Sequence, residues 1–283
     1  MAEIRKIAPG DFPQQLAEII DPPKALYLRG SLPPPDHKLL TVVGSRKMST
    51  YGKDACEYLI QGLAGYPITI VSGLALGIDA VAHRAALAAG LQTLALPGSG
   101  VNDDVLYPAS HRGLAKEIIA AGGGIMSEFE PDAQTMLHFF PQRNRIMAGI
   151  SHAVLIVEAG LKSGTLITAK LATEYNRELL IVPHSIFSEG GAGGHIFMKL
   201  GAAPVRSPED IFDVLGIKKN EVQKELLLNQ KEKKLLDLLS SPLSRDELIR
   251  ELGVPTGEAN VLIASMELRG LITESLGELR RGY

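Results

Sequence analysis

The stretch ITIVSGLALGIDAVAHRAALAAG, residues Ile68–Gly90, decides the fold, because an apolar run, a glycine-bearing loop and a helix follow one another in it. Ile68–Val71 has the composition of a buried strand, and Asp79–Ala89 is rich in alanine, which suits close packing on a sheet. Between them, Ser72 and Gly73 let backbone N–H groups approach a ligand at the helix N-terminus. The pattern predicts a phosphate cradle or, alternatively, a plain tight connection in an α/β protein.

Short apolar runs and helical stretches alternate on both sides of this unit. Further strands are predicted at Leu39–Val43, Thr93–Leu96, Ile125–Ser127, Ala153–Val157, Leu179–Val182 and, more weakly, Ala203–Val205. Further helices are predicted at Tyr51–Leu63, Gly113–Ala121, Asn144–Ile150 and Thr165–Tyr175. Continuous apolar strands separated by helices are typical of the doubly wound α/β class, a mostly parallel sheet covered on both faces.

The chain divides into four parts by composition. Residues 1–38 are rich in turn formers and are expected to pack on the core as an extension. Residues 39–217 hold the predicted sheet domain, and the charged stretch 218–232 is typical of a linker. Residues 233–283 carry three predicted helices and a closing hairpin, which indicates a small winged-helix domain.

The predicted helices of this small domain are Lys233–Leu239, Ser244–Leu252 and Thr256–Arg269. The second should begin with a capping box, with Ser244 as N-cap and Glu247 three residues later. Residues 218–283 contain 11 Lys plus Arg and 11 Asp plus Glu, so the domain is expected to contact a protein or to regulate the chain. On the predicted wing, only Arg280 and Arg281 are placed to contact phosphates.

Composition limits the class of protein. The chain has 283 residues, a formal net charge of −3 and one cysteine, Cys56. A polyanion would therefore need a local basic site, and no internal disulfide is possible. The sequence has no secretory N-terminus and no apolar run long enough to span a bilayer, so a cytoplasmic location without membrane contact is expected.

Candidate binding residues follow the predicted strands. Gly44, Ser45 and Arg46 come directly after one strand and form a natural anion grip. Gly98 lies in the glycine turn after another strand, where a simple turn is an equal alternative. Ser163, Gly164 and Thr165 open a helix and offer a second backbone cradle for an oxyanion.

A cluster of cations is predicted at the start of the helix that contains Asn144. Arg143 and Arg145 flank this residue, and the helix macrodipole disfavours cations at an N-terminus. An anionic partner is therefore expected to compensate them. Asp79 and Glu158 are expected to shape the loops and to orient the cations.

Other chemistries have little support in the sequence. No regular G-x-G-x-x-G opens a helix and no G-x-x-x-x-G-K-[ST] occurs, which disfavours a dinucleotide oxidoreductase and a nucleoside triphosphatase. The seven histidines include no i, i+4 pair, so neither a metal site nor a cofactor is predicted. Cys56 lies within a predicted helix, where a packed core thiol is expected.

A set of short blocks resembles the DNA-processing protein A (DprA/Smf) family. The blocks run in family order over about residues 12–215. They include Asp21-Pro22-Pro23, Val43-Gly44-Ser45-Arg46, Ser72-Gly73-Leu74-Ala75, Tyr107-Pro108, Ser127-Glu128, Phe140-Pro141, Arg143-Asn144-Arg145, Ser163-Gly164-Thr165 and Val182-Pro183. The loop after Tyr107-Pro108 departs from the family pattern, and Arg112 is the expected substitute for a DNA-contacting residue there.

The resemblance implies an extended Rossmann domain that binds single-stranded DNA, forms a homodimer and helps to load the RecA recombinase during natural transformation. It also implies a winged-helix-like C-terminal domain. The predicted DNA-binding residues are Gly44, Ser45, Arg46, Ser72, Gly73, Gly98, Tyr107, Arg112, Arg143, Asn144, Arg145, Ser163, Gly164 and Thr165. Tyr107 or Phe140 is expected to stack on a base.

Two other function classes remain open. A Rossmann-like nucleotide phosphoribohydrolase uses a similar glycine-threonine turn, but Ser163–Thr168 offers no carboxylate at the helix start. A pure protein adaptor would bind neither DNA nor nucleotide. The favoured hypothesis is a non-catalytic protein, with a dimer surface made by Ile211, Phe212, Val214 and Leu215 or, alternatively, with these side chains capping the sheet.

Overall fold

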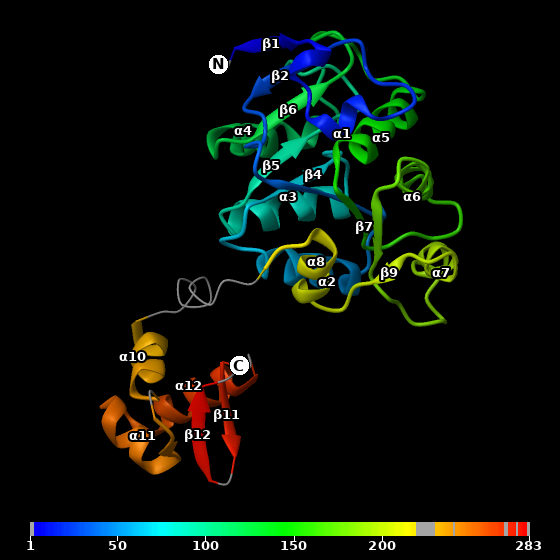
Figure 1. Cartoon of the computed structure of the whole chain (residues 1–283). Helices are drawn as coiled ribbons and strands as arrows, with labels where there is room; N and C mark the ends of the chain where they lie inside the picture. Colours follow the sequence, from blue (N-terminus) through cyan, green and yellow to red (C-terminus); the bar gives the residue numbers. More distant parts are fainter. Residues whose placement is uncertain (1–2, 219–229, 240, 269–270, 276, 282–283) are drawn as a thin grey trace. The chain divides into compact units, whose positions relative to one another are not determined.

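The computed structural model describes residues 3–218, 230–239, 241–268, 271–275 and 277–281. The chain forms two compact units, residues 1–218 and 219–283 (Figure 1). The first unit holds a nine-stranded sheet, and the second holds a three-stranded sheet.

The large sheet has the strand order β1-β2-β6-β5-β4-β3-β7-β8-β9. The strands are β1 Ile4–Ile7, β2 Leu26–Gly30, β3 Lys38–Val43, β4 Ile68–Ser72, β5 Gln92–Ala95, β6 Gly124–Ser127, β7 Ala153–Ile156, β8 Glu178–Ile181 and β9 Ala203–Pro204. All neighbours from β6 to β9 pair in parallel, whereas β1 and β2 are antiparallel. The predicted doubly wound, mostly parallel sheet is confirmed.

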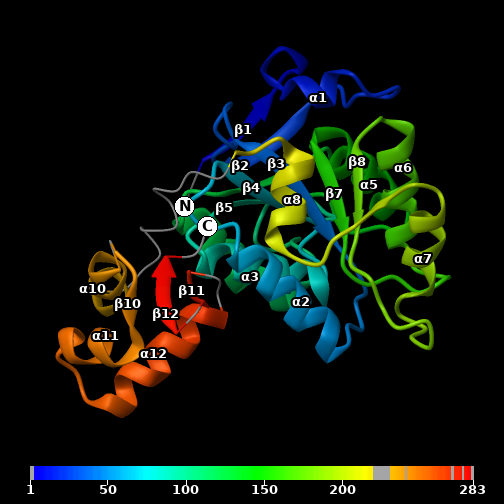
Figure 2. The same cartoon turned by 60° about the horizontal axis from the view of Figure 1, so that its bottom comes forward.

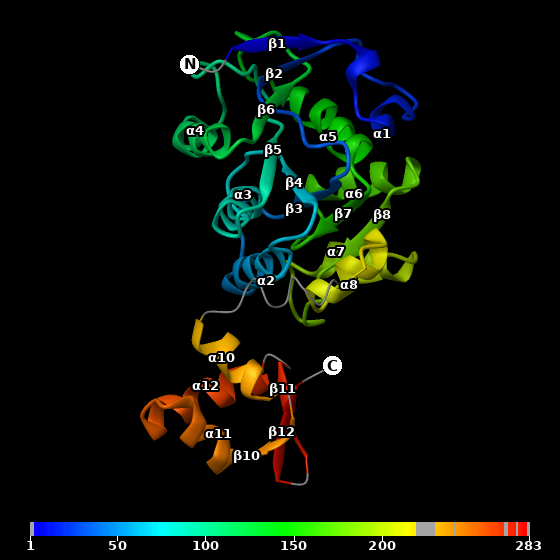
Figure 3. The ribbon, with the colours of Figure 1, turned by 60° about the vertical axis from the view of Figure 1, so that its left-hand side comes forward.

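Helices cover both faces of this sheet because both sets of alternating strand side chains are apolar. The helices are α1 Gln14–Ala17, α2 Thr50–Gln61, α3 Ile78–Ala88, α4 Arg112–Ala120, α5 Phe139–Ile150, α6 Thr165–Glu174, α7 Ala192–Lys199 and α8 Pro208–Leu215. Leu40 and Val42 of β3 pack with α2, α3 and α8, whereas Leu39 and Val43 pack with α1, α5 and α6. Figures 2 and 3 show α2 and α3 side by side on one face.

The N-terminal segment does more than pack on the core, because it adds two strands to the sheet. Tyr27 of β2 pairs with Ser127 of β6, and β1 then pairs with β2 as the edge strand. β1 has the sequence IRKI, with its two central residues exposed. A short edge strand of mixed polarity resembles a loop in sequence, which is why the apolar pattern did not predict it.

Two helices differ from the prediction. α5 begins at Phe139 and not at Asn144, because Pro141 lies in the first helical turn, where a missing N–H costs nothing. α7 was not predicted, since it begins in a glycine-rich stretch of low helix propensity. A side chain at Gly193 would approach Ala159 O to 2.7 Å, so close packing requires glycine there.

The second unit combines three helices with a small sheet. Its elements are α10 Gln230–Leu238, β10 Leu243–Ser244, α11 Arg245–Leu252, α12 Thr256–Leu268, β11 Ile272–Ser275 and β12 Glu278–Arg281. Ser244 N donates to Glu247 Oε2 at 3.0 Å and the Ser244 hydroxyl accepts from Glu247 N, which confirms the capping box. Residues 219–229 of the predicted linker, and Arg269, lie outside the described residues.

α8 does not carry an exposed surface of the kind predicted for a dimer. Ile211, Phe212 and Leu215 are buried in the core, and Val214 is half-buried against the same cluster. The Phe212 ring lies 4.3 Å from that of Tyr66. The assignment of these residues to a dimer interface is therefore corrected. They cover the sheet, which is the alternative that the sequence analysis gave.

Candidate functional site

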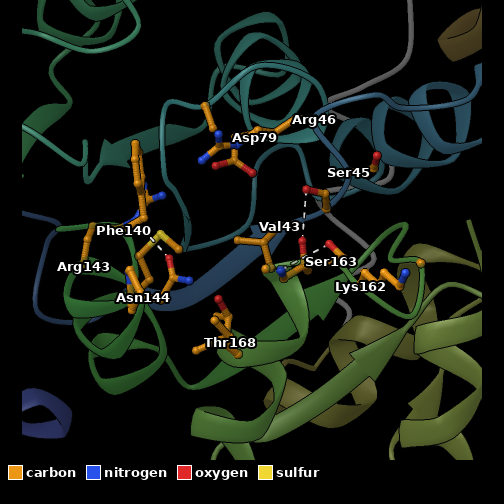
Figure 4. Close-up of a pocket in the computed structure, with 18 of the residues that line it drawn as sticks. Val43, Ser45, Arg46, Asp79, Phe140, Arg143, Asn144, Lys162, Ser163 and Thr168 are labelled. Carbon is orange, nitrogen blue, oxygen red and sulfur yellow. Dashed lines mark hydrogen bonds between the residues drawn. The ribbon is translucent and has the colours of Figure 1, made fainter. Parts of the chain in front are cut away.

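A pocket of about 690 Å³ lies at the carboxyl ends of β3 and β7. The chain changes direction across the sheet between these two neighbours, since β4, β5 and β6 lie on one side of β3 and β7, β8 and β9 on the other. Ligands of doubly wound proteins bind at such a switch point. The loops after β3 and β7, together with α5 and the start of α6, line the pocket (Figure 4).

The structure brings eight of the fourteen predicted binding residues to this pocket. They are Gly44, Ser45, Arg46, Arg143, Asn144, Ser163, Gly164 and Thr165. The six that do not line it are Ser72, Gly73, Gly98, Tyr107, Arg112 and Arg145.

The loop after β4 uses its polar groups within the protein. Gly73 N donates to Asp79 Oδ2 at 3.1 Å, and Ile78 N donates to Ser45 O at 3.2 Å. The Ser72 hydroxyl donates to a carbonyl of β3 at 2.6 Å. The predicted phosphate cradle is corrected accordingly, because the protein's own carboxylate occupies the place expected for a phosphate.

Arg143 is an internal cation. Its guanidinium donates to Gly73 O at 2.6 Å and to Leu96 O. Burial lowers the pKa of Arg143 to about 10, and burial raises the pKa of Asp79 although the Arg143 charge opposes that shift. Arg143 lies in the second turn of α5, so the argument from the helix macrodipole was wrong. The predicted phosphate ligand instead fixes the ends of β4 and β5.

Arg145 lies outside the pocket and is also paired. Its guanidinium donates to the two carboxylate oxygens of Glu128 at 2.5 and 2.7 Å and to Asp21 O at 2.7 Å. Only 15% of the Arg145 side chain is exposed. The bidentate pair joins α5 to the end of β6, and the bond to Asp21 O adds the N-terminal segment. These contacts leave Arg145 little capacity for a phosphate.

Three other cations at the pocket are exposed. Arg46 and Lys47 follow β3, and Lys162 follows β7. Within the described residues, none of the three takes part in an ion pair. Lys162 was not among the predicted binding residues, although its place beside Ser163, between a strand and a helix N-terminus, is a usable signal.

An aromatic pair lies beside these cations. The Arg46 guanidinium lies 4.8 Å from the centroid of the Phe140 ring, and the Tyr107 ring lies 5.8 Å from that ring on an exposed loop. A side chain at Gly98 would approach Phe140 to 2.7 Å, so glycine is required for this packing. The aromatic faces are suited to stacking on planar groups.

Arg112 lies apart from the cations of the pocket. It donates to Asp104 O at 2.5 Å, and its Nε atom is buried without a hydrogen-bond partner among the described residues. Its predicted contact with DNA remains a prediction.

The loops after β3 and β7 are joined to each other. Thr165 Oγ1 donates to Gly44 O at 3.1 Å, and Thr165 N donates to Ser163 Oγ at 3.2 Å. Glu158 accepts from Ser49 N at 3.0 Å and from the Ser49 hydroxyl at 2.8 Å, which anchors the start of α2. Glu158 therefore fixes the position of the loop that contains Arg46.

Acid-base and metal chemistry have few groups to use at this site. Asp79 is the one acidic side chain in the described lining of the pocket, and it is buried. Burial raises the pKa of the Cys56 thiol, which keeps it protonated. Over the part of the chain described, no group of three or more His, Cys, Asp and Glu residues is placed to hold a metal.

In that same part, no helix is long and apolar enough to cross a membrane.

Sequence comparison assigns most of the chain to one family. The profile described as DNA recombination-mediator protein A matches residues 4–216. The chain belongs to this family. A second profile, described as the DprA winged helix domain, matches residues 219–277. The second unit is therefore a winged-helix domain of the DprA type, and the predicted membership of the DprA/Smf family is confirmed.

Named relatives of this family are similar over most of the chain. Protein Smf of Escherichia coli (strain K12) is 42% identical over 204 residues, which cover 72% of this chain and 54% of that protein. DNA processing protein DprA of Streptococcus pneumoniae is 40% identical over 200 residues, which cover 71% of this chain and 70% of that protein. The match thus spans about half the length of the E. coli relative.

Two solved DprA structures share the fold. The X-ray structure of DprA from Streptococcus pneumoniae has a TM-score of 0.69 and 37% identity, and the match covers 75% of this chain and 74% of that one. DprA from Helicobacter pylori has a TM-score of 0.66 and 28% identity, with 76% and 98% covered. The latter structure is described as giving insights into a unique single-stranded DNA binding mode.

Proposed function

We propose that this DprA family member binds single-stranded DNA at the switch-point pocket, with the phosphates held by Arg46, Lys47 and Lys162. The observation that carries the proposal is the contrast between these exposed cations, which have no ion-pair partner in the described residues, and the internally bonded Arg143 and Arg145. Because the net charge of the chain is −3, a local group of cations is what a phosphate backbone requires.

The aromatic pair favours single strands over duplex. Phe140 lines the pocket beside Arg46, and Tyr107 is 43% exposed next to it. Bases stack on such rings only when they are free of a complementary strand, and stacking contributes about 1–3 kcal/mol per base without sequence preference. The DNA binding described for the Helicobacter pylori relative supports the same class of ligand.

We infer that the protein acts without catalysing a reaction on the DNA. The phosphoribohydrolase alternative needs a carboxylate that reaches a ribose, and the acidic residue of the described lining, Asp79, is engaged by Gly73 N and the Arg143 charge. Incubation with nucleoside monophosphates tests this point. Release of free base would support the enzyme and contradict the proposal.

Fluorescence anisotropy with labelled single-stranded and duplex DNA over a range of salt tests the binding site. Arg46→Ala and Lys162→Ala should each weaken single-strand binding and reduce the slope of log K against log salt by about 0.7 for each lost phosphate contact. Arg5→Ala is the matched control, since Arg5 is exposed on β1, five strands from β3. Identical curves for the wild type, Arg46→Ala and Lys162→Ala would contradict this site.

The description of the matching family, DNA recombination-mediator protein A, supports a role in recombination. We infer that the protein protects incoming single strands and helps RecA to load on them during natural transformation. A strand-exchange assay with RecA on DNA coated by single-strand binding protein measures this activity. The wild type should shorten the lag before exchange, and Arg46→Ala should shorten it less. An unchanged lag with the DNA-binding wild type would count against RecA loading.

We also infer a homodimer, through a surface other than α8. Ile186 and Phe187, in the loop after β8, are 83% and 90% exposed, and Ile196 and Leu200 near α7 are 46% and 76% exposed. These elements lie at the outer end of the sheet (Figure 2). A second copy would remove this apolar surface from water. Sedimentation should show a dimer for the wild type and a monomer for Phe187→Asp, and a monomeric wild type at micromolar concentration would exclude the dimer.

A further inference from the structure

His111 is a buried side chain that does not line the switch-point pocket. Only 5% of the residue is exposed. Its Nδ1 atom lies 2.7 Å from Leu74 O, on a loop 37 positions earlier in the chain. Because a carbonyl oxygen only accepts hydrogen bonds, the ring must carry a proton on Nδ1 in this contact. His111 therefore donates to the backbone of the loop that follows β4.

The acceptor belongs to a residue in an unfavourable backbone conformation. Leu74 has a φ of 58°, in the left-handed region that residues with a side chain rarely adopt. Its side chain is fully buried in the same apolar cluster as Leu106, Leu114 and Ile118. Burial fixes the side chain, and the bond from His111 fixes the carbonyl. Together these contacts hold the loop in a conformation that its backbone alone disfavours.

The loop that contains Leu74 supports the backbone of Arg46. Ile78 N, at the end of this loop, donates to Ser45 O at 3.2 Å. A Cβ atom at Gly77 would come within 2.8 Å of the Arg46 Cα atom. The two loops thus contact each other backbone to backbone, so a change of conformation at Leu74 must displace one of them.

His111 also belongs to the segment that carries Tyr107. His111 N donates to Pro108 O at 2.9 Å, which closes a short turn directly after Tyr107 and Pro108. The Tyr107 ring lies 5.8 Å from the Phe140 ring, and the Arg46 guanidinium lies 4.8 Å from the same ring. One side chain therefore joins the two backbone segments whose aromatic and cationic groups meet at Phe140.

We propose that His111 is a positioning residue for single-stranded DNA, because its bond to Leu74 O sets the spacing between the stacking group Tyr107 and the phosphate-binding group Arg46. This inference rests on the proposed binding of single-stranded DNA and adds a residue that touches no DNA. A strand uses a stacking contact and a phosphate contact at once only when the two loops keep their spacing. A site that is ordered in advance loses less free energy on binding.

A matched pair of variants separates the hydrogen bond from the bulk of the side chain. In His111→Asn, the amide nitrogen is attached to Cγ, as Nδ1 is in histidine, so it can donate to Leu74 O. Leucine has the branched shape of asparagine and no donor, so His111→Leu leaves the carbonyl unpaired. Affinity for oligo-dT should fall about tenfold in His111→Leu, because the binding conformation is less populated. His111→Asn should recover an affinity within about twofold of the wild type.

Double-mutant cycles on the full-length protein show whether His111 acts through the two loops. In the Arg46→Ala and Tyr107→Ala backgrounds, His111→Leu should lower affinity by less than about threefold, because a group that it positions is absent. His152→Leu is the matched control for lost stability. His152 Nδ1 accepts from Leu39 N at 3.0 Å, away from the pocket, so this variant also leaves a backbone group unpaired. It should lower the urea midpoint and keep the wild-type affinity.

The proton position in the wild type can be measured directly. In an NMR spectrum of protein with nitrogen-labelled histidine, the His111 ring should show a proton on Nδ1. The signals that vanish in His111→Asn identify this ring. A ring without a proton on Nδ1 would overturn the proposal, because it cannot donate to Leu74 O.

The outcomes separate this inference from the proposed function. Weak binding in His111→Leu, recovery in His111→Asn and coupling to both Arg46 and Tyr107 support a positioning role. An unchanged affinity in His111→Leu, an equal loss in both His111 variants, additive effects in either background or an equal loss in His152→Leu would each overturn it and leave the phosphate site intact. Failure of the wild type to bind oligo-dT at low salt would overturn the proposed function, and this inference with it.

Discussion

Replacing Arg143 with methionine distinguishes a structural cation from a DNA ligand. In the wild type, the guanidinium donates to Gly73 O and Leu96 O and faces the buried carboxylate of Asp79. Methionine fills a similar volume and carries no charge. The substitution therefore leaves Asp79 as a buried charge without its counter-charge, and it leaves two carbonyls without donors.

The expected loss of stability is large. Leaving a buried charge without the opposite charge that faces it costs about 3–5 kcal/mol, against a total free energy of unfolding of about 5–15 kcal/mol. Because burial already raises the pKa of Asp79, its carboxyl can take up a proton in the variant, and this places the loss toward the lower end of the range.

Urea unfolding followed by tyrosine fluorescence measures this loss in the first unit. The chain has no tryptophan, and six of its seven tyrosines, all except Tyr283, lie before residue 219. The midpoint for Arg143→Met should fall by roughly 1–2 M urea. Arg46→Met is the matched control, since Arg46 is exposed and its contact with the Phe140 ring is worth only about 0.5–1 kcal/mol.

The same two variants should also differ in their affinity for single-stranded DNA. Arg46→Met should keep a midpoint near that of the wild type and lose affinity for single strands. Removing both buried charges in Asp79→Asn with Arg143→Met should recover part of the stability that the single variant loses. If Arg143→Met unfolds at the wild-type midpoint and flattens the salt dependence of binding, the reasoning is refuted and Arg143 is a phosphate ligand.

Three further changes test other parts of the molecule. Burial lowers the pKa of His83 to about 3, so below about pH 6.5 the unfolded chain binds a proton that the folded chain refuses. Urea titrations at pH 7 and pH 5 should show the wild type losing about 2 kcal/mol more than His83→Leu, and equal losses would contradict the buried neutral histidine. Gly77 has a φ of 79°, and a side chain there would collide with Ser45 O, so Gly77→Ala should lower the urea midpoint more than Gly90→Ala, whose Cβ meets nothing within 4 Å. Deleting residues 218–283, with 11 cations against 11 anions, should change single-strand affinity only a few-fold, and a hundredfold loss in a folded dimer would assign DNA binding to the winged-helix domain.

The strands of the parallel sheet could be predicted because each is buried on both faces and therefore reads as an apolar run. The ends of these runs also located the loops that line the pocket. β1 was missed as a strand, since an edge position leaves polar residues in the pattern. β2 was missed because its short apolar run lies within a segment rich in turn formers. The switch point itself depends on the order of the strands, which local patterns do not contain.

The roles of individual polar residues could not be predicted, because the sequence does not show which groups the protein uses for itself. Asp79 appeared to open a helix beside a free glycine loop, yet its carboxylate accepts from Gly73 N. Nothing in the sequence separates Thr168, whose hydroxyl has no partner in the described residues, from Thr165, which donates to Gly44 O. These differences arise only when distant loops meet.

Arg143 and Arg145 show how one helix serves two purposes. Residues two apart on a helix are separated by about 200° around the helix axis, so they point in nearly opposite directions. Arg143 therefore lines the pocket, whereas Arg145 points away from the pocket and binds Glu128. A correct helix start at Phe139 would have allowed this separation to be predicted from the sequence.

The N-terminal segment packs against the side of α5 that faces away from the pocket. Arg145 donates to Asp21 O at 2.7 Å, and Arg177 donates both to Gln15 O at 2.5 Å and to Gly149 O at 3.1 Å. A side chain at Gly149 would approach Ile19 to 2.8 Å, so the segment and α5 pack without space between them. Since the opposite side of α5 presents Asn144 to the pocket, the position of that amide depends on contacts made by residues far from any DNA.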